Sequence, residues 1–255
     1  MLLAMDVGNT NTVIALYDGD NLRRSWRMAT EKSRASDEIG VLLLQFLKTE
    51  QLDVKAVDAV ILSSVVPPVM HALKNAIKRY LGCRIMEVGP GVKTGMNIRC
   101  DDPKEVGADQ IANAVAAVKK YGAPLIVVDY GTATTFCVVD QRGDYLGGLI
   151  VPGLKISMDA LFERAAKLPR IEIKKPPALI GKTTVGSMQA GAFYALAAQT
   201  DGIVERIRAR LGQPDCRVIA TGGLAGFAAE EAETIDVVDR RLTLDGLRLI
   251  YEKNC

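Results

Sequence analysis

Two short segments of the sequence place an aspartate ahead of a glycine and a run of hydroxyl and amide side chains. The first reads DVGNTNT from Asp6, and the second reads DYGTATT from Asp129. Each follows a short apolar run that is typical of a buried strand. A turn of this kind holds backbone N–H groups beside a carboxylate, and its glycine (Gly8 or Gly131) lets a phosphate approach the backbone closely.

The chemistry that these turns could support is the binding of a polyphosphate. Backbone amides and polar side chains would hold the phosphate oxygens, while the carboxylate faces a cation that bridges to those oxygens. A single turn of this type is weak evidence, because similar sequences are common in turns. Two of them in equivalent positions favour a clamp around one nucleotide.

The elements around the two turns repeat as well. In each half the turn joins two strands, an acidic turn with glycine ends the second strand, and a later apolar strand ends in small residues. The acidic turns lie at 18–20 and 140–144, and the later strands at 61–64 and 218–223. The repeat predicts a duplicated α/β fold, with two mixed β-sheet halves, flanking helices and a central cleft. The halves are expected at residues 1–118 and 119–255, and the alternative is two unrelated α/β hairpins that share turn residues by chance.

Hydrophobic periodicity predicts the helices that accompany these strands. Ser36 is a good N-cap for a helix over 36–48. Further helices are expected at 69–81, 106–120 and 183–211, the last with an interruption near Gly202. The continuous apolar run at 59–66 predicts a buried parallel strand.

Composition excludes several classes of protein. The chain has 255 residues, of which 49% are hydrophobic and 24% charged, so it is too apolar for disorder. A formal net charge of +2 gives no basic field for nucleic acid. One histidine, and five cysteines without a CxxC pair, argue against a zinc site and a disulfide framework. No apolar run reaches the length of a membrane span, so we expect a cytoplasmic protein without nucleic-acid or membrane partners.

Asp109 is a third acidic candidate for chemistry. It lies in the segment GADQ at the start of an alanine-rich helical pattern. The dipole at a helix N-terminus favours an ionised carboxylate there. Position alone leaves a second interpretation open, in which Asp109 is a first-turn aspartate with no further role.

Ordered motifs along nearly the whole chain resemble the type III pantothenate kinases, within the superfamily of acetate and sugar kinases, Hsp70 and actin. The motifs are DVGNTNT at 6, SSVVPP at 63, DDPKEVGAD ending at 109, DYGTATTF at 129, YLGG at 145, GKTT at 181 and ATGGLA at 220. The resemblance implies an actin-like (ribonuclease H-like) fold and ATP-dependent phosphorylation of pantothenate, the first step toward coenzyme A. It also implies Mg²⁺ with ATP, a monovalent cation (K⁺ or NH₄⁺), and a homodimer with the acceptor site near the subunit interface.

The resemblance further implies roles for single residues at matching positions. Asp109 would be the general base for the pantothenate hydroxyl. Asp129 would hold the monovalent cation, and Asp6 would face Mg²⁺ through the phosphates. The residues expected to contact ATP are Asp6, Val7, Gly8, Asn9, Thr10, Asn11, Thr12, Val13 and Thr132. Those expected to contact pantothenate are Cys100, Gly107, Ala108, Asp109, Gln110 and Thr184.

Two positions depart from the family pattern on the acceptor side. The family usually reads IRYD and GADR, whereas this chain has Cys100 in place of the tyrosine and Gln110 in place of the arginine. Loss of an arginine fork removes charged hydrogen bonds worth about 1.5–3 kcal/mol, roughly tenfold to more than a hundredfold in rate. Three hypotheses stay open: a pantothenate kinase, a non-catalytic nucleotide-binding regulator resembling the Bvg accessory factors, and a kinase for another small hydroxyl acceptor.

Overall fold

The computed structural model describes residues 1–255, and the chain forms two compact units. The first unit comprises residues 1–96, 102–116 and 242–255, and the second comprises 97–101 and 117–241. The units interleave along the chain, because the C-terminal segment returns to the first one. The sequence halves at 1–118 and 119–255 stay a prediction.

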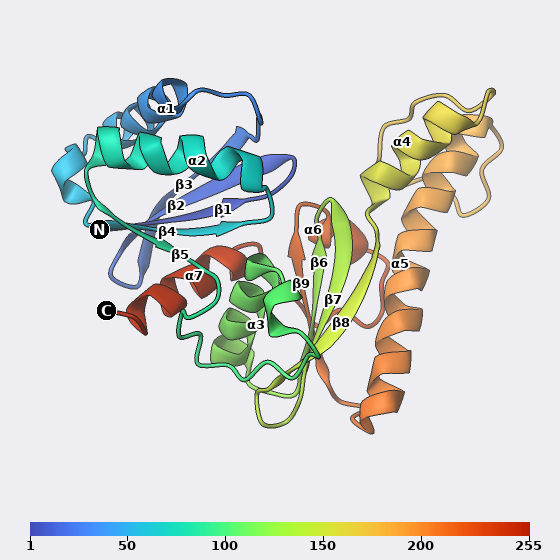
Figure 1. The fold of residues 1–255 in the computed structure, drawn as a ribbon. Helices are drawn as coiled ribbons and strands as arrows, with labels where there is room; N and C mark the ends of the chain where they lie inside the picture. Colours follow the sequence, from blue (N-terminus) through green and yellow to red (C-terminus); the bar gives the residue numbers. More distant parts are fainter. The chain divides into compact units, whose positions relative to one another are not determined.

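The first unit is built on a five-stranded mixed sheet in the order β3-β2-β1-β4-β5. The central strand β1 is antiparallel to β2 and parallel to β4 (Figure 1). Its side chains and those of β4 are nearly all buried, as expected for strands covered on both faces. The strands are β1 Leu2–Val7, β2 Asn11–Asp18, β3 Asn21–Ala29, β4 Ala59–Ser64 and β5 Arg84–Glu87.

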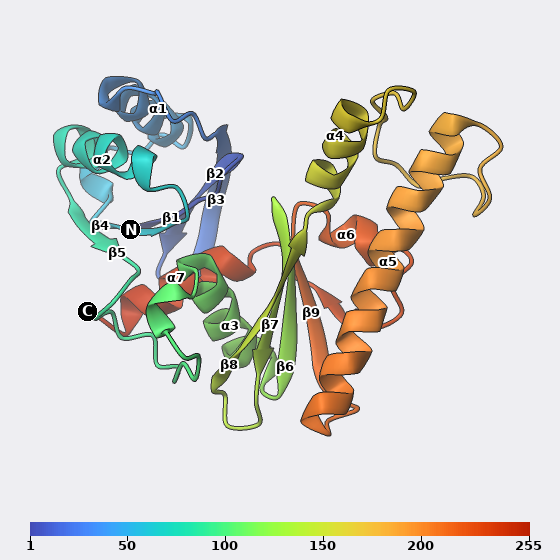
Figure 2. The same cartoon turned by 45° about the vertical axis from the view of Figure 1, so that its right-hand side comes forward.

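Helices cover both faces of this first sheet. Helices α1 and α2 lie together on one face, and α7 packs against β1 and β4 on the other (Figure 2). The helices are α1 Ser36–Thr49, α2 Pro67–Ala76 with a π-helical continuation Ile77–Leu81, and α7 Leu242–Glu252, with short 3₁₀ turns Val54–Ala56 and Pro103–Glu105. Leucine, isoleucine and valine from α1, α2 and the sheet form one buried core.

The second unit repeats the topology of the first. Its five strands run in the order β10-β9-β6-β7-β8, so β6 takes the central place of β1, with β7 antiparallel and β9 parallel to it. The strands are β6 Leu125–Tyr130, β7 Ala133–Val139, β8 Tyr145–Pro152, β9 Arg217–Gly222 and β10 Val237–Val238. The helices are α4 Leu154–Arg164, α5 Thr184–Leu211 and α6 Ala225–Ala228. The predicted duplication into two mixed sheets is confirmed.

Three local expectations differ from the structure. Ser36 is the first residue of α1 rather than its N-cap, which is Ala35. Helix α5 runs without a break through Gly202, whose carbonyl accepts a hydrogen bond from the Arg206 guanidinium. A single glycine costs a helix only about 1 kcal/mol, and the buried face of α5 outweighs that. Strand β4 ends at Ser64 rather than at Val66, because Pro67 begins α2 and restricts the backbone before it.

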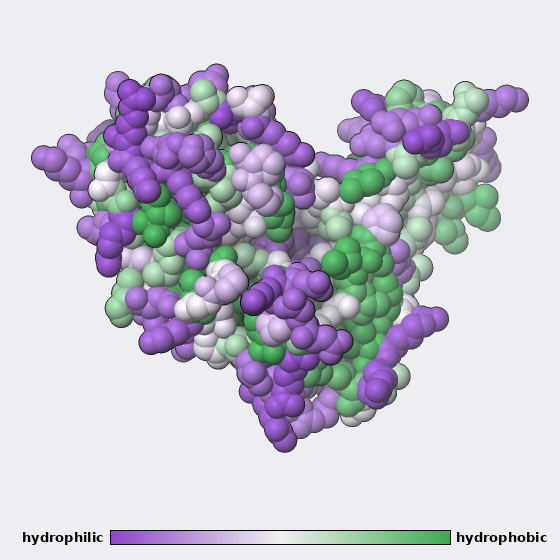
Figure 3. Space-filling view, in the orientation of Figure 1, coloured by the Kyte–Doolittle hydropathy of each residue, from purple (hydrophilic) through white to green (hydrophobic).

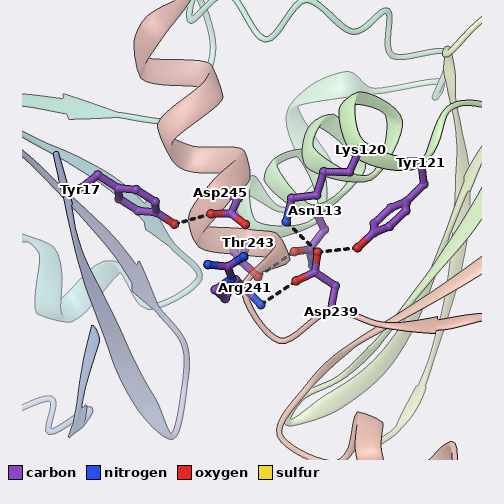
Figure 4. Close-up of polar contacts among 8 residues, drawn as sticks. All are labelled: Tyr17, Asn113, Lys120, Tyr121, Asp239, Arg241, Thr243 and Asp245. Atoms are coloured by element: carbon purple, nitrogen blue, oxygen red, sulfur yellow. Dashed lines mark hydrogen bonds and ion pairs between the residues drawn. The ribbon is translucent and has the colours of Figure 1, made fainter. Parts of the chain in front are cut away.

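Buried polar contacts fix the two segments through which the chain passes between the units (Figure 4). Helix α3, Ala108–Tyr121, is one such segment, and the start of α7 is the other. Within the first unit, Thr243 donates to the side-chain oxygen of Asn113 at 2.7 Å. Tyr17 donates to Asp245 at 2.6 Å. These contacts hold α3 and α7 in the first unit, and α3 is the helix that carries Asp109.

Asp239 is the corresponding buried acid of the second unit (Figure 4). Its carboxylate accepts hydrogen bonds from Lys120 at 2.7 Å, from the Tyr121 hydroxyl at 2.9 Å and from the N–H of Arg241 at 3.0 Å. Burial alone would raise the pKa of Asp239, but these donors outweigh it and hold the pKa below its usual value. The ionised carboxylate therefore stabilises the packing of the end of α3 against the segment before α7 within the second unit.

None of the helices combines the length and the apolar composition that crossing a bilayer requires.

Candidate functional site

The first acidic turn lies between β1 and β2, where the sequence predicts it. Asp6 is half-buried near the carboxyl end of β1, and the exposed Asn9 and Thr10 form the tip of the turn. The N–H of Gly8 donates to the carbonyl of Asn11 at 3.1 Å, which closes the turn. The turn therefore offers a carboxylate with backbone and polar side chains beside it, the donor set that a polyphosphate needs.

A serine from the neighbouring strand contacts the carboxylate of this turn. Ser63 on β4 lies opposite Asp6 in the parallel register. It is fully buried, and its hydroxyl donates to Asp6 Oδ1 at 2.5 Å. Ser63 belongs to the motif SSVVPP, but nothing in the sequence indicates that it contacts Asp6.

The second acidic turn lies between β6 and β7 in the second unit. Asp129 is half-buried near the end of β6, and Gly131 and Thr132 are exposed. The N–H of Gly131 donates to the carbonyl of Ala133 at 3.0 Å. As in the first turn, a carboxylate lies two residues before a glycine that closes a tight loop.

The two turns differ in length by one residue. Val7 pairs with Thr12 across the first hairpin, and Tyr130 pairs with Thr134 across the second. Thr12 and Thr134 are both almost completely buried. Thr135, which aligns with Thr12 in the sequence repeat, lies one position further along β7, so the spatial equivalent of Thr12 is Thr134.

Gly222 at the end of β9 borders the carboxylate of the second turn. Its φ is +91°, a conformation that L side chains rarely adopt. A Cβ there would lie 2.5 Å from Asp129 Oδ1 and 2.7 Å from the carbonyl oxygen of Tyr130. The two oxygens therefore face one small space that only a glycine leaves open.

A second glycine lets helix α4 begin against the same turn. Gly153, the residue before α4, is buried, and a Cβ on it would lie 2.1 Å from the carbonyl oxygen of Thr132. Neither Gly153 nor Gly222 was among the residues that we expected to form the site. The two glycines lie in the sequence segments PGL and ATGG. Their importance for the site shows only when the fold places them against the turn.

Asp109 lies in the first turn of α3, as expected, and its carboxylate folds back toward the helix start. Oδ1 accepts a hydrogen bond from the N–H of Gln110 at 2.9 Å. A Cβ on Gly107 would lie 2.4 Å from this oxygen, so glycine at 107 allows the arrangement. Burial raises the pKa of the Asp109 carboxyl above its usual value, against the lowering effect of the hydrogen bonds from backbone N–H groups.

The residues expected on the acceptor side fall on separate elements. Gly107, Ala108, Asp109 and Gln110 form one continuous segment at the start of α3 in the first unit. Cys100 belongs to the second unit and lies beside Gly147 of β8, and burial raises the pKa of its thiol. Thr184 is the exposed first residue of α5, whose N-cap Thr183 accepts a hydrogen bond from the N–H of Gly186 at 3.0 Å.

The donor set suits cations that arrive with a phosphate or bind to few protein ligands. The structure contains no group of three or more His, Cys, Asp or Glu side chains that could hold a metal ion. Mg²⁺ commonly binds through one or two carboxylates together with substrate phosphates and water. A half-buried Asp6 beside a turn of backbone N–H groups and polar side chains fits that mode.

Comparison with known proteins decides the family. The sequence model of the family described as "Type III pantothenate kinase" matches residues 2–206. The chain belongs to the type III pantothenate kinase family. A type III pantothenate kinase of an Exiguobacterium species is 53% identical over 254 residues, covering 100% of this chain and 99% of the relative. Those of Geobacillus kaustophilus and Geotalea daltonii are both 52% identical and cover 100% of this chain and 98% and 99% of the relatives.

Solved structures of more distant proteins show the fold. A "conserved putative Baf family transcriptional activator" from Campylobacter jejuni aligns with a TM-score of 0.60 at 20% identity, covering 99% of this chain and 98% of that one. The ethanolamine utilization protein EutJ from Carboxydothermus hydrogenoformans aligns with a TM-score of 0.56 at 16% identity, covering 97% and 89%. At these identities the likeness concerns architecture alone, and it confirms the actin-like fold.

Proposed function

We infer that this protein transfers the γ-phosphoryl group of ATP to the hydroxyl of pantothenate, the first step of coenzyme A biosynthesis. The observation that carries this conclusion is the full-length similarity to type III pantothenate kinases at 53% identity. The paired acidic turns of the two sheets supply the type of phosphate-binding chemistry that such a transfer needs.

On the nucleotide side, the turn from Asp6 to Val13 binds the ATP phosphates. Its backbone N–H groups and polar side chains would hold phosphate oxygens, and Asp6 would hold Mg²⁺, which would supply positive charge to offset the negative charge of the phosphates. Thr132 contributes a further hydroxyl from the second turn. What supports this assignment is the exposure of Asn9, Thr10 and Thr132 at the tips of the two turns.

Asp129 holds a monovalent cation, K⁺ or NH₄⁺. Hard cations such as K⁺ bind to carboxylate and carbonyl oxygens. The space beside Gly222 is bordered by two such atoms, Asp129 Oδ1 and the carbonyl oxygen of Tyr130. The bound cation supplies positive charge that offsets the negative charge developing on the phosphates.

Asp109 acts as the general base. Its carboxylate takes the proton of the pantothenate hydroxyl as that oxygen forms a bond to the γ-phosphorus, and the bond from the γ-phosphorus to the bridging oxygen breaks, releasing ADP. A raised pKa suits this role, because a base works best when its pKa approaches the operating pH. Gly107, Ala108, Gln110, Cys100 and Thr184 are the further contacts that we propose for pantothenate.

We propose that the active form is a homodimer. Several large apolar side chains of the second unit are exposed, including Ile150 at 72%. Apolar surface gathers over β8 (Figure 3). The exposed residues are Leu149 and Ile150 on β8, Ile156, Leu161 and Phe162 on α4, and Leu179, Ile180 and Val185 at and before the start of α5. Patches of this kind mark association surfaces. A cytoplasmic location stays a prediction.

The test of the function is ATP-dependent phosphorylation of pantothenate with Mg²⁺ and K⁺ present, measured as ADP release and product formation. We expect turnover with pantothenate at submillimolar to millimolar concentration. Intact nucleotide binding without any turnover at millimolar pantothenate would reject the kinase function in favour of a nucleotide-binding regulator.

The identity of the acceptor is tested separately, because Cys100 and Gln110 depart from the family pattern. Cys100→Tyr and Gln110→Arg together restore the usual residues. A gain in kcat/KM for pantothenate of tenfold or more would show that the natural acceptor site has drifted from the family pattern, and kinase activity on another small alcohol with pantothenate excluded would show a different acceptor. No gain, with good wild-type turnover, assigns pantothenate to the natural site.

A further inference from the structure

Ser63 lies outside the expected site, and its hydroxyl donates a hydrogen bond to the carboxylate of the first acidic turn. We propose that Ser63 is a positioning residue for Asp6, which fixes the carboxylate in the orientation that receives Mg²⁺-bound nucleotide. The proposal rests on the proposed function, since it takes Asp6 to face Mg²⁺.

The geometry of the contact is that of a strong hydrogen bond. The distance from Ser63 Oγ to Asp6 Oδ1 is 2.5 Å, at the short end of the range for a hydroxyl that donates to a carboxylate. Ser63 is fully buried on the central strand pair, so its hydroxyl is shielded from water and has a fixed direction. A carboxylate oxygen held in this way loses rotational freedom before any ligand binds.

The residues around Ser63 show that a hydroxyl at this position is unusual. The four residues before it in β4, Ala59 to Leu62, are all apolar and buried. A hydroxyl in such a strand costs free energy unless it has a partner, and Asp6 is that partner.

The second sheet repeats the arrangement. Thr221 lies opposite Asp129 in the β6–β9 register, as Ser63 lies opposite Asp6 in the β1–β4 register. Thr221 is also almost completely buried and follows apolar strand residues. A buried hydroxyl therefore stands beside the acidic residue of each turn, although the two sheets have different cores. This recurrence favours a role tied to the carboxylates over one of local packing.

The test measures nucleotide affinity rather than turnover. Binding of a fluorescent ADP analogue is compared in Mg²⁺ and in EDTA for the wild type and for Ser63→Ala. We expect Ser63→Ala to weaken binding in Mg²⁺ by about tenfold or more, the effect of losing a hydrogen bond to a charged group, and to change binding in EDTA much less. Ser63→Thr, which keeps the hydroxyl and copies Thr221, should restore most of the affinity.

Ser64→Ala is the matched control. Ser64 is the adjacent serine, and its hydroxyl accepts a hydrogen bond from the N–H of Val66 at 3.0 Å, a contact within the loop. Its loss should lower thermal stability without changing the ratio of affinities in Mg²⁺ and EDTA. In an Asp6→Ala background, Ser63→Ala should have no further effect on affinity, because its target is absent.

Three results would overturn the proposal: unchanged affinity of Ser63→Ala in Mg²⁺, equal losses in Mg²⁺ and EDTA, or an additional loss in the Asp6→Ala background. Each is independent of pantothenate. A protein that binds Mg²⁺-nucleotide through Ser63 and Asp6 but transfers no phosphate would reject the kinase function and leave this inference intact.

Discussion

Gly222→Ala is the substitution whose consequences the structure defines most closely. Gly222 has φ at +91°, and an added Cβ would lie 2.5 Å from Asp129 Oδ1, 2.7 Å from the Tyr130 carbonyl oxygen and 2.8 Å from its carbon. Two of these atoms belong to backbone in the centre of the second sheet, which cannot move far. We therefore expect the Asp129 carboxylate to shift and the methyl group of the alanine to fill the space in which we propose that the monovalent cation binds.

The magnitude has two parts. An alanine at positive φ costs about 1–2 kcal/mol, and forcing a methyl group into packed surroundings costs about 1–3 kcal/mol. The free energy of unfolding should fall by about 2–5 kcal/mol. The K⁺ concentration for half-maximal activity should rise about tenfold or more, because the cation loses a charged ligand.

Gly223→Ala provides the control. A Cβ on Gly223 meets no atom within 4 Å, so its free energy of unfolding should change by no more than about 0.5 kcal/mol. Urea unfolding and a K⁺ titration of kinase activity measure both effects. Equal stability and equal K⁺ activation of the two variants would refute the reasoning.

Two further substitutions probe aspartates whose pKa values are shifted in the fold. Asp109→Asn should lower kcat about 10²- to 10⁴-fold with nucleotide affinity unchanged, and a smaller loss in rapid-quench assays would contradict the role of base. The pKa of Asp109 is raised in the folded protein, so the stability of the wild type falls as the pH rises from the usual aspartate pKa through the raised one. Asp109→Asn should therefore be more stable than the wild type at neutral pH. Thermal melts in which Asp109→Asn is the less stable protein would contradict this. The pKa of Asp239 is lowered, so its contribution is present at neutral pH and is lost as the pH falls through that lowered value. Asp239→Asn should lower the free energy of unfolding by about 1.5–3 kcal/mol at pH 7. A penalty that does not shrink as the pH is lowered below the usual aspartate pKa would be inconsistent with a role for the ionised carboxylate.

Much of the fold could be predicted from the sequence because strand and turn signals are local. The apolar runs before Asp6 and Asp129 and the glycines after them specify two hairpins, and their repetition specifies two similar sheets. The sequence wrongly predicted an interruption of the helix near Gly202, since the buried face of α5 outweighs the cost of one glycine. The equivalence of Thr12 and Thr134 could not be predicted, because it depends on the length of a turn rather than on its composition.

The sequence by itself determined the family, the duplicated mixed sheets and the position of Asp109 in the first turn of a helix. These features depend on residue types at fixed spacing along the chain. Only the tertiary structure decided that Ser63 contacts Asp6, that Gly222 borders Asp129 and that α7 returns to the first sheet. Ser63 and Asp6 are 57 positions apart in the sequence, and the pairing of parallel strands brings them together. No local sequence pattern encodes which strand lies beside which. Register and strand order follow from burying both faces of each sheet at once, which is a property of the whole chain.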